Sequence, residues 1–352
     1  MAAQKTLFSV RGPKPRVFST PSPDTSTPSP DLIRGGQNKP IPELFHLDAP
    51  VDIVYTWVDG TDPSWLARKA QFNNSPASPD ATSALRFSDR GELKHSLRSI
   101  EMFAPWVNHI WLVTDNQRPS WLVEDDKLTV VDHREIFTDP SVLPVFNSHA
   151  IETQIHHIPD LAEHFVYFND DLFLARPVTP ELFFAGNGMS LFALSPTEVL
   201  PGPVAETDMA VESAAKNTRD FLIDVFGRTP AHKIRHIPHA HLRSNLYEIE
   251  ETHPEVIAAS LTRFREPGNF PMLSMLGQYY AYAKGRAALG EIHQDYTEPT
   301  RDTFEYALAR WPLRRDLDVV CVNNLEALSR AKNAAVERFY ASMFPSPSRW
   351  ER

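Results

Sequence analysis

The chain has 352 residues, of which 42% are hydrophobic and 23% charged, and its formal net charge is −10. These proportions are typical of a soluble globular protein and exclude a mostly disordered chain, and the acidic balance argues against nucleic acid as a partner. Every apolar run is shorter than the roughly 18 residues that cross a bilayer, and the first residues lack the apolar core of a secretory signal. We therefore expect a cytoplasmic protein without a transmembrane segment.

The single cysteine, Cys321, excludes an intrachain disulfide and a cysteine-based structural zinc site, and we expect it to be a small buried apolar residue. Residues 1–45 are rich in Pro, Ser, Thr and Gly, which predicts a disordered tail. We expect one α/β domain over 46–350, in which about 195–315 form a covering lobe. Residues 316–350 then supply a strand and a C-terminal helix that return to the core.

The first predicted strand, residues 51–58, is rich in β-branched and aromatic residues and ends at the turn pair Asp59-Gly60. A helix should follow, because Asp89 can act as its cap and Glu92 as the capping-box partner three residues later. The apolar side chains of this helix would share one face. They are Leu93, Leu97, Ile100 and Phe103.

Three more apolar segments, 110–113, 128–131 and 165–168, read as strands, and each is followed within a few residues by an aspartate. Between the last two, Asn147 and Ser148 could cap a helix that carries Ala150, Ile151 and Ile155. Strands that alternate with helices predict a mostly parallel sheet, and parallel strands that end in aspartate place carboxylates along one edge.

The second half of the chain is rich in Pro, His and Arg and predicts an inserted lobe over this edge. We expect a strand at 186–193 and helices at 211–226, 254–262 and 326–344. The apolar side of the last helix would consist of Leu328, Ala331, Ala335, Phe339 and Met343.

Asn169, Asp170 and Asp171 follow the fourth strand, where ligands of α/β sheets collect. Adjacent carboxylates repel each other, which suggests a bound cation, although a turn or a helix cap would use the same residues. Motifs for dinucleotide binding, phosphate-binding loops, zinc peptidases and serine hydrolases are absent from the sequence.

Histidines crowd two segments, at positions 232, 236, 239 and 241 and at 156 and 157. They are a weak zinc signal, and either exposed loop histidines or a single proton donor facing a phosphate would give the same pattern. Arg263 and Arg265 alternate around an aromatic residue, so they form a phosphate clamp or ordinary surface ion pairs. Together with the carboxylates, these residues suit a metal-bound nucleotide sugar or another diphosphate.

Several motifs in series resemble the Stealth family. They are DIVYTWVDG at 52–60, GELKHSLRSI at 91–100, APWV at 104–107, VTDNQ at 113–117, FNSHAIE at 146–152 and FNDD at 168–171. The looser matches are RHIP at 235–238, RFR at 263–265, VCVNN at 320–324 and FPSPS at 344–348. The family comprises capsular and exopolysaccharide phosphotransferases and is similar to the catalytic part of the eukaryotic N-acetylglucosamine-1-phosphotransferase.

The resemblance implies transfer of a sugar 1-phosphate from a nucleotide sugar, usually a UDP-hexose, to a hydroxyl of an oligosaccharide or polysaccharide, with release of UMP. It also implies a divalent cation, Mg²⁺ or Mn²⁺. We expect α/β architecture, a Rossmann-like or GT-A-like mostly parallel sheet flanked by helices with an inserted helical lobe. Peripheral association with the inner face of the membrane, through partners, stays open.

Each residue role is carried over from the matching motif. Glu152, Asp171 and Asn323 are the expected metal ligands, and Asp171 or Asp170 is the expected base. His236 and Arg265 would face the phosphates. The donor contacts would be Asp59, Arg98, Asn116 and Arg263. The family pattern has Asn-Asp where this chain has Asn323-Asn324, so the chain lacks one negative ligand and would bind its ion more weakly.

Two alternatives remain open at this point. A metal-dependent glycosyltransferase would break the bond between the sugar carbon C1 and oxygen, and would release UDP. The Asn324 difference also allows a catalytically degenerate protein that only binds sugar nucleotides.

Overall fold

A computed structural model describes residues 43–72, 87, 89–323 and 328–352. The elements given below lie in one compact unit, Leu44–Arg352. Most of the predicted disordered tail and Asn324 fall outside the described residues. Within the described part of the chain, no helix is both long enough and apolar enough to span a bilayer.

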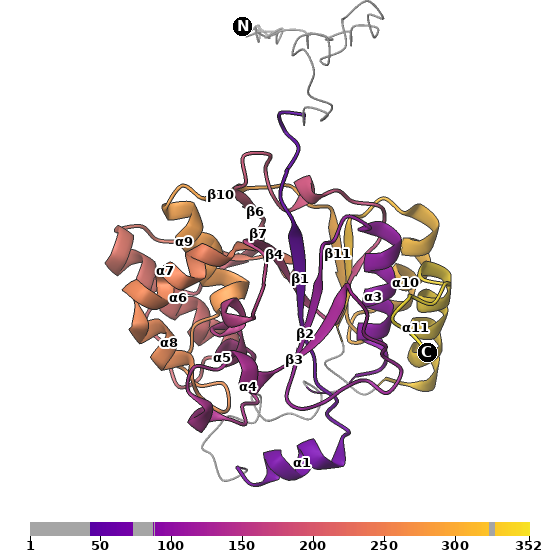
Figure 1. The fold of residues 1–352 in the computed structure, drawn as a ribbon, viewed down its shortest axis with the longest axis horizontal. Helices are drawn as coiled ribbons and strands as arrows, with labels where there is room; N and C mark the ends of the chain where they lie inside the picture. The colour runs from indigo at the N-terminus through magenta and orange to yellow at the C-terminus, as the bar shows by residue number, and fades with distance from the viewer. Residues whose placement is uncertain (1–42, 73–86, 88, 324–327) are drawn as a thin grey trace, which may run out of the picture. The chain divides into compact units, whose positions relative to one another are not determined.

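The centre of this unit is a five-stranded sheet with the strand order β3-β2-β1-β4-β9 (Figure 1). Its strands are β1 (Val51–Thr56), β2 (Ile110–Thr114), β3 (Leu128–Asp132), β4 (His164–Asn169) and β9 (His239–Leu242). The first four run parallel, and β9 pairs with β4 in the antiparallel direction. The order 3-2-1-4 is that of a Rossmann-like sheet, so the predicted mostly parallel sheet is confirmed.

The register brings the ends of the parallel strands to one level. Tyr55 of β1 pairs with Leu112 on one side and with Phe168 on the other. Because all four strands run the same way, the residues that follow each of them emerge at one edge of the sheet. The predicted row of carboxylates therefore lies at this edge.

Successive residues of the central strands pack into two separate cores. Tyr55 and Phe168 belong to one core, and Val54 and Tyr167 belong to the other. Side chains of a strand alternate between the two faces of its sheet, so strands that are buried on both faces read as continuous apolar runs. This explains why the sequence signals at 51–56 and 165–168 were strong.

Helices cover both faces of the sheet (Figure 1). One face carries α3 (Glu92–Phe103), α10 (Phe304–Arg314) and α11 (Arg330–Met343). The other face carries α4 (His133–Ile136), α5 (Ser148–Glu152), α6 (Ala210–Phe226), α7 (Arg243–Thr252), α8 (Pro254–Ser260) and α9 (Gly277–Ala283). Helix α1 (Pro63–Ala70) follows β1. Shorter turns are η3 (Pro140–Val142), η4 (Ile155–His157), η5 (Pro180–Leu182) and the π-helical η6 (Met272–Leu276).

A second sheet has the strand order β11-β12-β5, and its strand β5 follows β4 of the central sheet in the chain. Its strands are β11 (Gln294–Thr297), β12 (Val319–Val322) and β5 (Leu172–Leu174). Asp170 and Asp171 form the link between β4 and β5, so they lie at the junction of the two sheets. Two smaller sheets pair β6 (Ser190–Phe192) with β10 (Ala287–Leu289) and β7 (Leu194–Glu198) with β8 (His232–Ile234).

The start of α3 differs from the prediction. The helix begins at Glu92 after Gly91, whose φ of 90° is in the left-handed region, and no side chain caps it. Asp89 instead accepts hydrogen bonds from the Gly91 amide at 2.7 Å and from the indole of Trp57 at 2.8 Å. The apolar face was predicted correctly, since Leu93, Leu97, Ile100 and Phe103 are all buried.

Other elements also differ from their predictions. Asn147 caps α5, but this helix ends at Glu152, and Ile155 opens the separate turn η4. The strand expected at 186–193 is reduced to β6. On α11 the predicted Ala335, Phe339 and Met343 are buried, whereas Ala331 is exposed.

Candidate active site

A cavity of about 850 Å³ opens at the carboxyl ends of β1 and β4. Thr56 and Asn169, the last residues of these strands, line it, and the lobe closes over it through α6, β7 and β8. Six of the ten predicted site residues line this cavity: Glu152, Asp170, Asp171, His236, Arg265 and Asn323. They come from segments that span roughly half of the chain, from Glu152 to Asn323, and the sheet junction and the lobe bring them together.

Asp171 lies at the centre of this group and contacts two side chains. Its Oδ1 is 3.4 Å from Nε2 of His236, and its Oδ2 accepts a hydrogen bond from Sγ of Cys321 at 3.4 Å. Burial disfavours the imidazolium, but the charge and hydrogen bond of Asp171 outweigh it and raise the pKa of His236. A histidine that changes charge near neutral pH and is held by a carboxylate is suited to proton transfer.

Asp170 belongs to a cluster of carboxyl groups beside this pair. Burial, and then the charges of Asp171, Glu92 and Asp89, raise the pKa of Asp170 well above its usual value. Burial likewise raises the pKa of Glu92, to about 7, against opposing backbone hydrogen bonds. Carboxyl groups that hold protons because they are buried and repel each other would release them to a cation, which favours a divalent ion beside Asp170.

Glu152 is buried and is held by the lobe. Its Oε2 accepts hydrogen bonds from the amides of Leu273 at 2.9 Å and Ser274 at 3.2 Å, and the Ser274 hydroxyl also donates to it at 3.1 Å. These groups oppose the effect of burial, which nevertheless raises the pKa of Glu152. Because its oxygens already accept these hydrogen bonds, Glu152 fastens α5 to η6 and is less available as a metal ligand than Asp170 or Asp171.

Arg265 brings positive charge to the same cavity. Its Nη2 donates to the hydroxyl of Ser148 at 2.7 Å, at the start of α5, and its charge lowers the pKa of Glu152 against the larger effect of burial. The neighbouring Asn147 holds the Arg265 loop, because its side chain donates to the carbonyl oxygens of Thr262 at 3.2 Å and Phe264 at 3.3 Å. A guanidinium fixed in this way is suited to an anionic group in the cavity.

Arg263 does not join Arg265 in the cavity. Its guanidinium lies over the ring of Phe72, 4.5 Å from the centroid, and donates to the carbonyl of Ser141. The two arginines alternate along the chain as expected, but the loop bends at Phe264, which packs in a separate aromatic cluster with Phe146. The predicted two-arginine clamp is therefore not formed.

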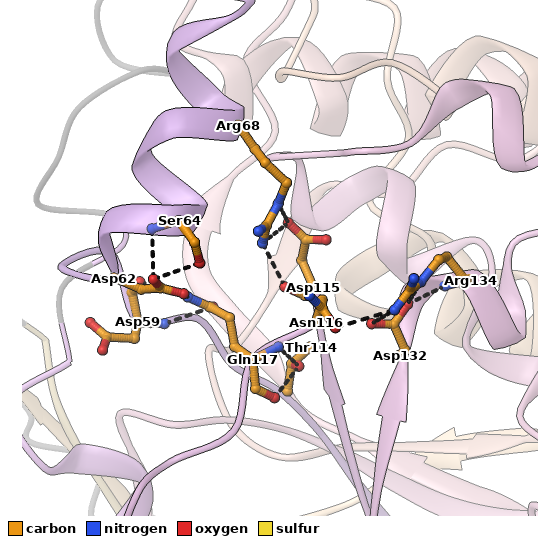
Figure 2. Close-up of polar contacts among 10 residues, drawn as sticks. All are labelled: Asp59, Asp62, Ser64, Arg68, Thr114, Asp115, Asn116, Gln117, Asp132 and Arg134. Carbon is orange, nitrogen blue, oxygen red and sulfur yellow. Dashed lines mark hydrogen bonds and ion pairs between the residues drawn. The ribbon is translucent and has the colours of Figure 1, made fainter.

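The carboxylates that follow β2 and β3 are held by arginines of the protein itself (Figure 2). Arg68 of α1 binds Asp115 through Nε at 3.2 Å and Nη2 at 2.9 Å. Arg134 binds Asp132 through Nε at 2.7 Å, and its Nη2 also reaches Oδ1 of Asn116 at 3.2 Å. Asn116 is exposed, has a φ of 52°, and does not line the cavity, whereas Asp115 does.

The carboxylates after β1 are likewise engaged (Figure 2). Asp59 accepts hydrogen bonds from the amide and hydroxyl of Thr61, and Asp62 caps α1 by accepting from the amide of Ser64 at 2.8 Å. The side chain of Gln117 ties the two segments together, because its Nε2 donates to the Asp59 carbonyl at 2.9 Å and to Oδ2 of Asp62 at 3.0 Å. Asp59 is thus at the predicted edge but outside the cavity lining.

Arg98 lies on the far side of α3. Its Nε and Nη2 bind the two carboxylate oxygens of Glu351 at 2.6 Å each, and its Nη1 donates to the carbonyl of Phe344 at 2.9 Å. The arginine fastens α3 to the C-terminal segment and borders a different cavity. Nothing in this geometry supports a donor contact.

The predicted histidine cluster is divided by the structure. His236 and His239 line the cavity and His241 does not, and both His239 and His241 are buried on β9, where burial lowers the pKa of both. The expectation of exposed loop histidines is therefore wrong for these two. Among the described residues, a metal ion could be held by Asp171, His236 and Cys321, whose ligand atoms lie within 4.8 Å of one another.

Three residues of the site were not singled out for it in the sequence. Cys321 was expected to be an inert core residue, and Glu92 only a capping-box partner. Tyr296 lines the cavity and donates from its hydroxyl to Glu298 at 2.8 Å. Burial and the Asp171 charge raise the pKa of the Cys321 thiol, so it stays protonated in the metal-free protein. Its position in an apolar segment two residues before Asn323 was the available signal.

Comparison with known proteins gives three family-model matches. They are Stealth protein conserved region 1 at residues 49–76, conserved region 2 at 86–192 and conserved region 3 at 235–282. An exopolysaccharide phosphotransferase of Streptomyces coelicolor is 44% identical over 308 residues, which cover 86% of this chain and 52% of that protein. The exopolysaccharide phosphotransferase CpsY of Mycobacterium leprae is 35% identical over 310 residues, covering 86% and 57%.

The chain thus spans about half the length of these curated relatives. Among solved structures, the galactosyltransferase LgtC, crystallised with donor and acceptor sugar analogues, is 10% identical with a TM-score of 0.38. That alignment covers 85% of this chain and 98% of the other. A likeness at this level says nothing about substrate or mechanism.

Proposed function

Because this chain belongs to the Stealth family, we propose that it is a sugar phosphotransferase of exopolysaccharide synthesis that transfers a sugar 1-phosphate from a nucleotide sugar, most simply a UDP-hexose. Five of the six predicted site residues in the cavity fall inside matched family regions: Glu152, Asp170 and Asp171 in the second, and His236 and Arg265 in the third. The curated relatives named above carry the name exopolysaccharide phosphotransferase.

The proposed reaction is a displacement at phosphorus. The oxygen of an acceptor sugar hydroxyl forms a bond to the phosphorus that carries the donor sugar. The bond from this phosphorus to the bridging oxygen breaks, and UMP leaves with that oxygen. The product is a phosphodiester between two sugars, and the hydroxyl proton passes to a base of the protein.

His236 is the base that the geometry favours, with Asp171 as its positioning partner. The carboxylate at 3.4 Å orients the imidazole and stabilises the imidazolium that forms when the proton is taken. This refines the expectation that an aspartate is the base, because Asp171 is better placed to act through the histidine. Arg265, fixed by Ser148, supplies charge for the transferred phosphoryl group.

Asp171, with Asp170 and Asn323 beside it in the cavity lining, would contribute oxygen ligands to the divalent cation. Oxygen donors of this kind suit Mg²⁺ or Mn²⁺. When bound, the ion would neutralise the diphosphate of the donor and the developing charge on the leaving group. It would also remove the repulsion that raises the pKa of Asp170.

The observation that carries the proposal is the pairing of Asp171 with His236 inside a cavity that also contains Arg265 and a carboxylate cluster. The test is incubation of the purified chain with a UDP-hexose, Mg²⁺ and an oligosaccharide acceptor, followed by chromatography of the nucleotides. The expected products are UMP and a phosphodiester signal in the ³¹P NMR spectrum. His236→Gln should abolish both.

His293 offers a matched control. Its Nδ1 lies 3.3 Å from a carboxylate oxygen of Asp318, but the pair is outside the cavity, so His293→Gln should leave turnover unchanged. UDP as the sole nucleotide product would instead identify a glycosyltransferase. Binding of UDP-hexose, seen as a rise in Tm, without release of either nucleotide would identify a binding protein.

A further inference from the structure

A second group of side chains lies outside the cavity described above. It consists of His156 and His157 on η4 and Glu250 on α7. Nε2 of His156 and Nε2 of His157 each lie 2.8 Å from the same oxygen, Oε2 of Glu250. The three ligand atoms lie within 4.8 Å of one another, and none of these residues lines the cavity.

The proton positions in this group are constrained by the backbone. Nδ1 of His157 lies 3.0 Å from the carbonyl oxygen of Ile136, at the end of α4, so this nitrogen carries a proton. In the neutral ring, Nε2 then presents its lone pair to the Glu250 carboxylate. Two lone pairs at hydrogen-bond distance repel, so either a proton or a metal ion must lie between His157 and Glu250.

The arrangement of His157 is the one that metal-ligating histidines adopt. Such a histidine binds the ion through one nitrogen and donates the other N–H to a carbonyl or carboxylate, which fixes the ring. The Ile136 carbonyl plays this part here.

We propose that His156, His157 and Glu250 bind a divalent transition-metal ion of the zinc class and so fasten η4 to α7. Two imidazoles and one carboxylate form a donor set typical of Zn²⁺ rather than Mg²⁺. Ligands at about 2.0–2.1 Å around a tetrahedral ion are about 3.3 Å apart, so the Glu250 oxygen would shift by roughly half an ångström. Its side chain is 25% exposed and free to make that shift, and water can occupy the fourth position.

The nearest other charge does not oppose the ion strongly. The guanidinium of Arg243 is directed at backbone carbonyls, those of His156 at 2.7 Å and of Ile158 and Leu161 at 2.9 Å each. The rings of His156 and Tyr247 make a T-shaped contact at a centroid distance of 4.7 Å. Arg243, Tyr247 and Glu250 all belong to α7, so this helix holds the histidine segment in place.

The test first removes metal from the full chain with a chelator and dialysis. Zinc is then added back, and the amount bound is measured by mass spectrometry of the metal and by titration calorimetry. All samples carry His236→Gln, because the cavity group of Asp171, His236 and Cys321 could also take zinc. In this background, His157→Arg should lose a whole zinc equivalent. Arginine retains a positive charge beside Glu250, so the metal-free variant should keep the Tm of its parent.

Cobalt gives a second readout, because tetrahedral Co²⁺ with these ligands absorbs in the visible. We expect that absorption in the parent and its loss in both His157→Arg and Glu250→Gln. His253→Gln is the matched control, since His253 pairs with Glu255 on the same lobe and lacks a second histidine partner there. Zinc content and cobalt spectra unchanged by His157→Arg and Glu250→Gln, or no zinc in the parent, would overturn the proposal.

Discussion

The edge of the central sheet has two ends that look alike in sequence and differ in structure. At the β1-β2-β3 end, Asp115 and Asp132 are each bound by an arginine, and Asp62 caps a helix. At the β4 end, Asp170 and Asp171 lie in a cluster of like charges with His236 beside them. At the first end, arginines of the protein compensate the charges of Asp115 and Asp132. At the second end, the clustered carboxylates would be compensated by a bound cation.

The difference teaches that position at a strand end is not enough to assign a function to an aspartate. Each of the four parallel strands delivers carboxylates to the same edge, but Arg68 and Arg134 neutralise two of them. A guanidinium partner favours the ionised form of a carboxylate and compensates its charge. A carboxylate that lies among other carboxyl groups has a raised pKa, and a bound cation would stabilise its ionised form. The following predictions compare the two ends.

The largest effect is expected for Asp171→Asn, which keeps the shape of the side chain and removes its charge. The imidazolium of His236 would lose its stabilising partner, and turnover should fall about 10³-fold, or roughly 4 kcal/mol of transition-state stabilisation. The matched change at the other end, Asp132→Asn, should alter turnover less than about twofold, because Asp132 does not line the cavity. Equal losses for both variants in a UMP-release assay would remove the distinction between the two ends.

A large effect on stability is expected for Arg98→Met. Its two-point ion pair with Glu351 is nearly buried, with exposed fractions of 14% and 3%, and the change would leave Lys94, at 3.1 Å, as the remaining cation beside this carboxylate. Unfolding in urea should show a loss of about 3 kcal/mol. The KM for the nucleotide sugar should not change, because Arg98 is remote from the cavity. A raised KM with unchanged stability would instead restore the donor contact suggested by the sequence.

A smaller effect concerns the titration of His236. Its pKa should lie above 6.5 in the wild type and below 6.5 in Asp171→Asn, because burial alone then acts on the ring. NMR of labelled histidine can follow both, with His293 as a reference in the same spectrum. Because the pKa of His236 is raised in the folded protein, the stability that its protonation contributes is complete below pH 6.5. This stability is lost as the pH rises through the folded-state pKa. Identical His236 titrations in the two proteins would show that Asp171 does not set the pKa of His236.

The smallest effect is expected for Asp62→Ala, at the β1-β2-β3 end. Loss of the cap on α1 should cost about 1 kcal/mol, whereas Asp62→Asn should cost less, since asparagine also caps helices. Hydrogen bonds from Gln117 and Ser64 lower the pKa of Asp62 to about 2. The charge-dependent part of its stabilisation is thus present above pH 3.8 and lost as pH falls towards 2. Thermal unfolding across this range is the measurement, and turnover should not respond.

The fold was predictable where burial leaves a mark on the sequence. The strands at 51–56 and 165–168 face two cores and read as apolar runs, and α3 shows its buried face at the helical period. Short strands such as β5 and β12 leave no comparable mark, since three or four apolar residues fit many structures. The cap of α3 was wrong because Gly91, in a left-handed conformation, takes the place that a capping side chain would fill.

The site was predictable only as a set of residue types at one edge. Nothing local to Asp115 reveals that Arg68, on another element, will bind it, or that Arg98 will turn towards Glu351. Arg263 and Arg265 are alternate residues, so an extended segment would point both side chains the same way. In the structure the loop bends between them, and their side chains have different partners. Such outcomes depend on contacts between segments far apart in the chain, which a single sequence does not specify.

The pairing of β5 with β12 has a consequence for the order in which the protein is made. Phe173 pairs with Val320, and this contact brings Cys321 and Asn323 to the residues around Asp171. A ribosome must therefore synthesise more than 300 residues before the last wall of the cavity can form. Contacts so distant in sequence form late in folding, because a long loop must close first. A nascent chain that stalls before β12 would carry the carboxylates and the histidine but could not assemble them into a complete site.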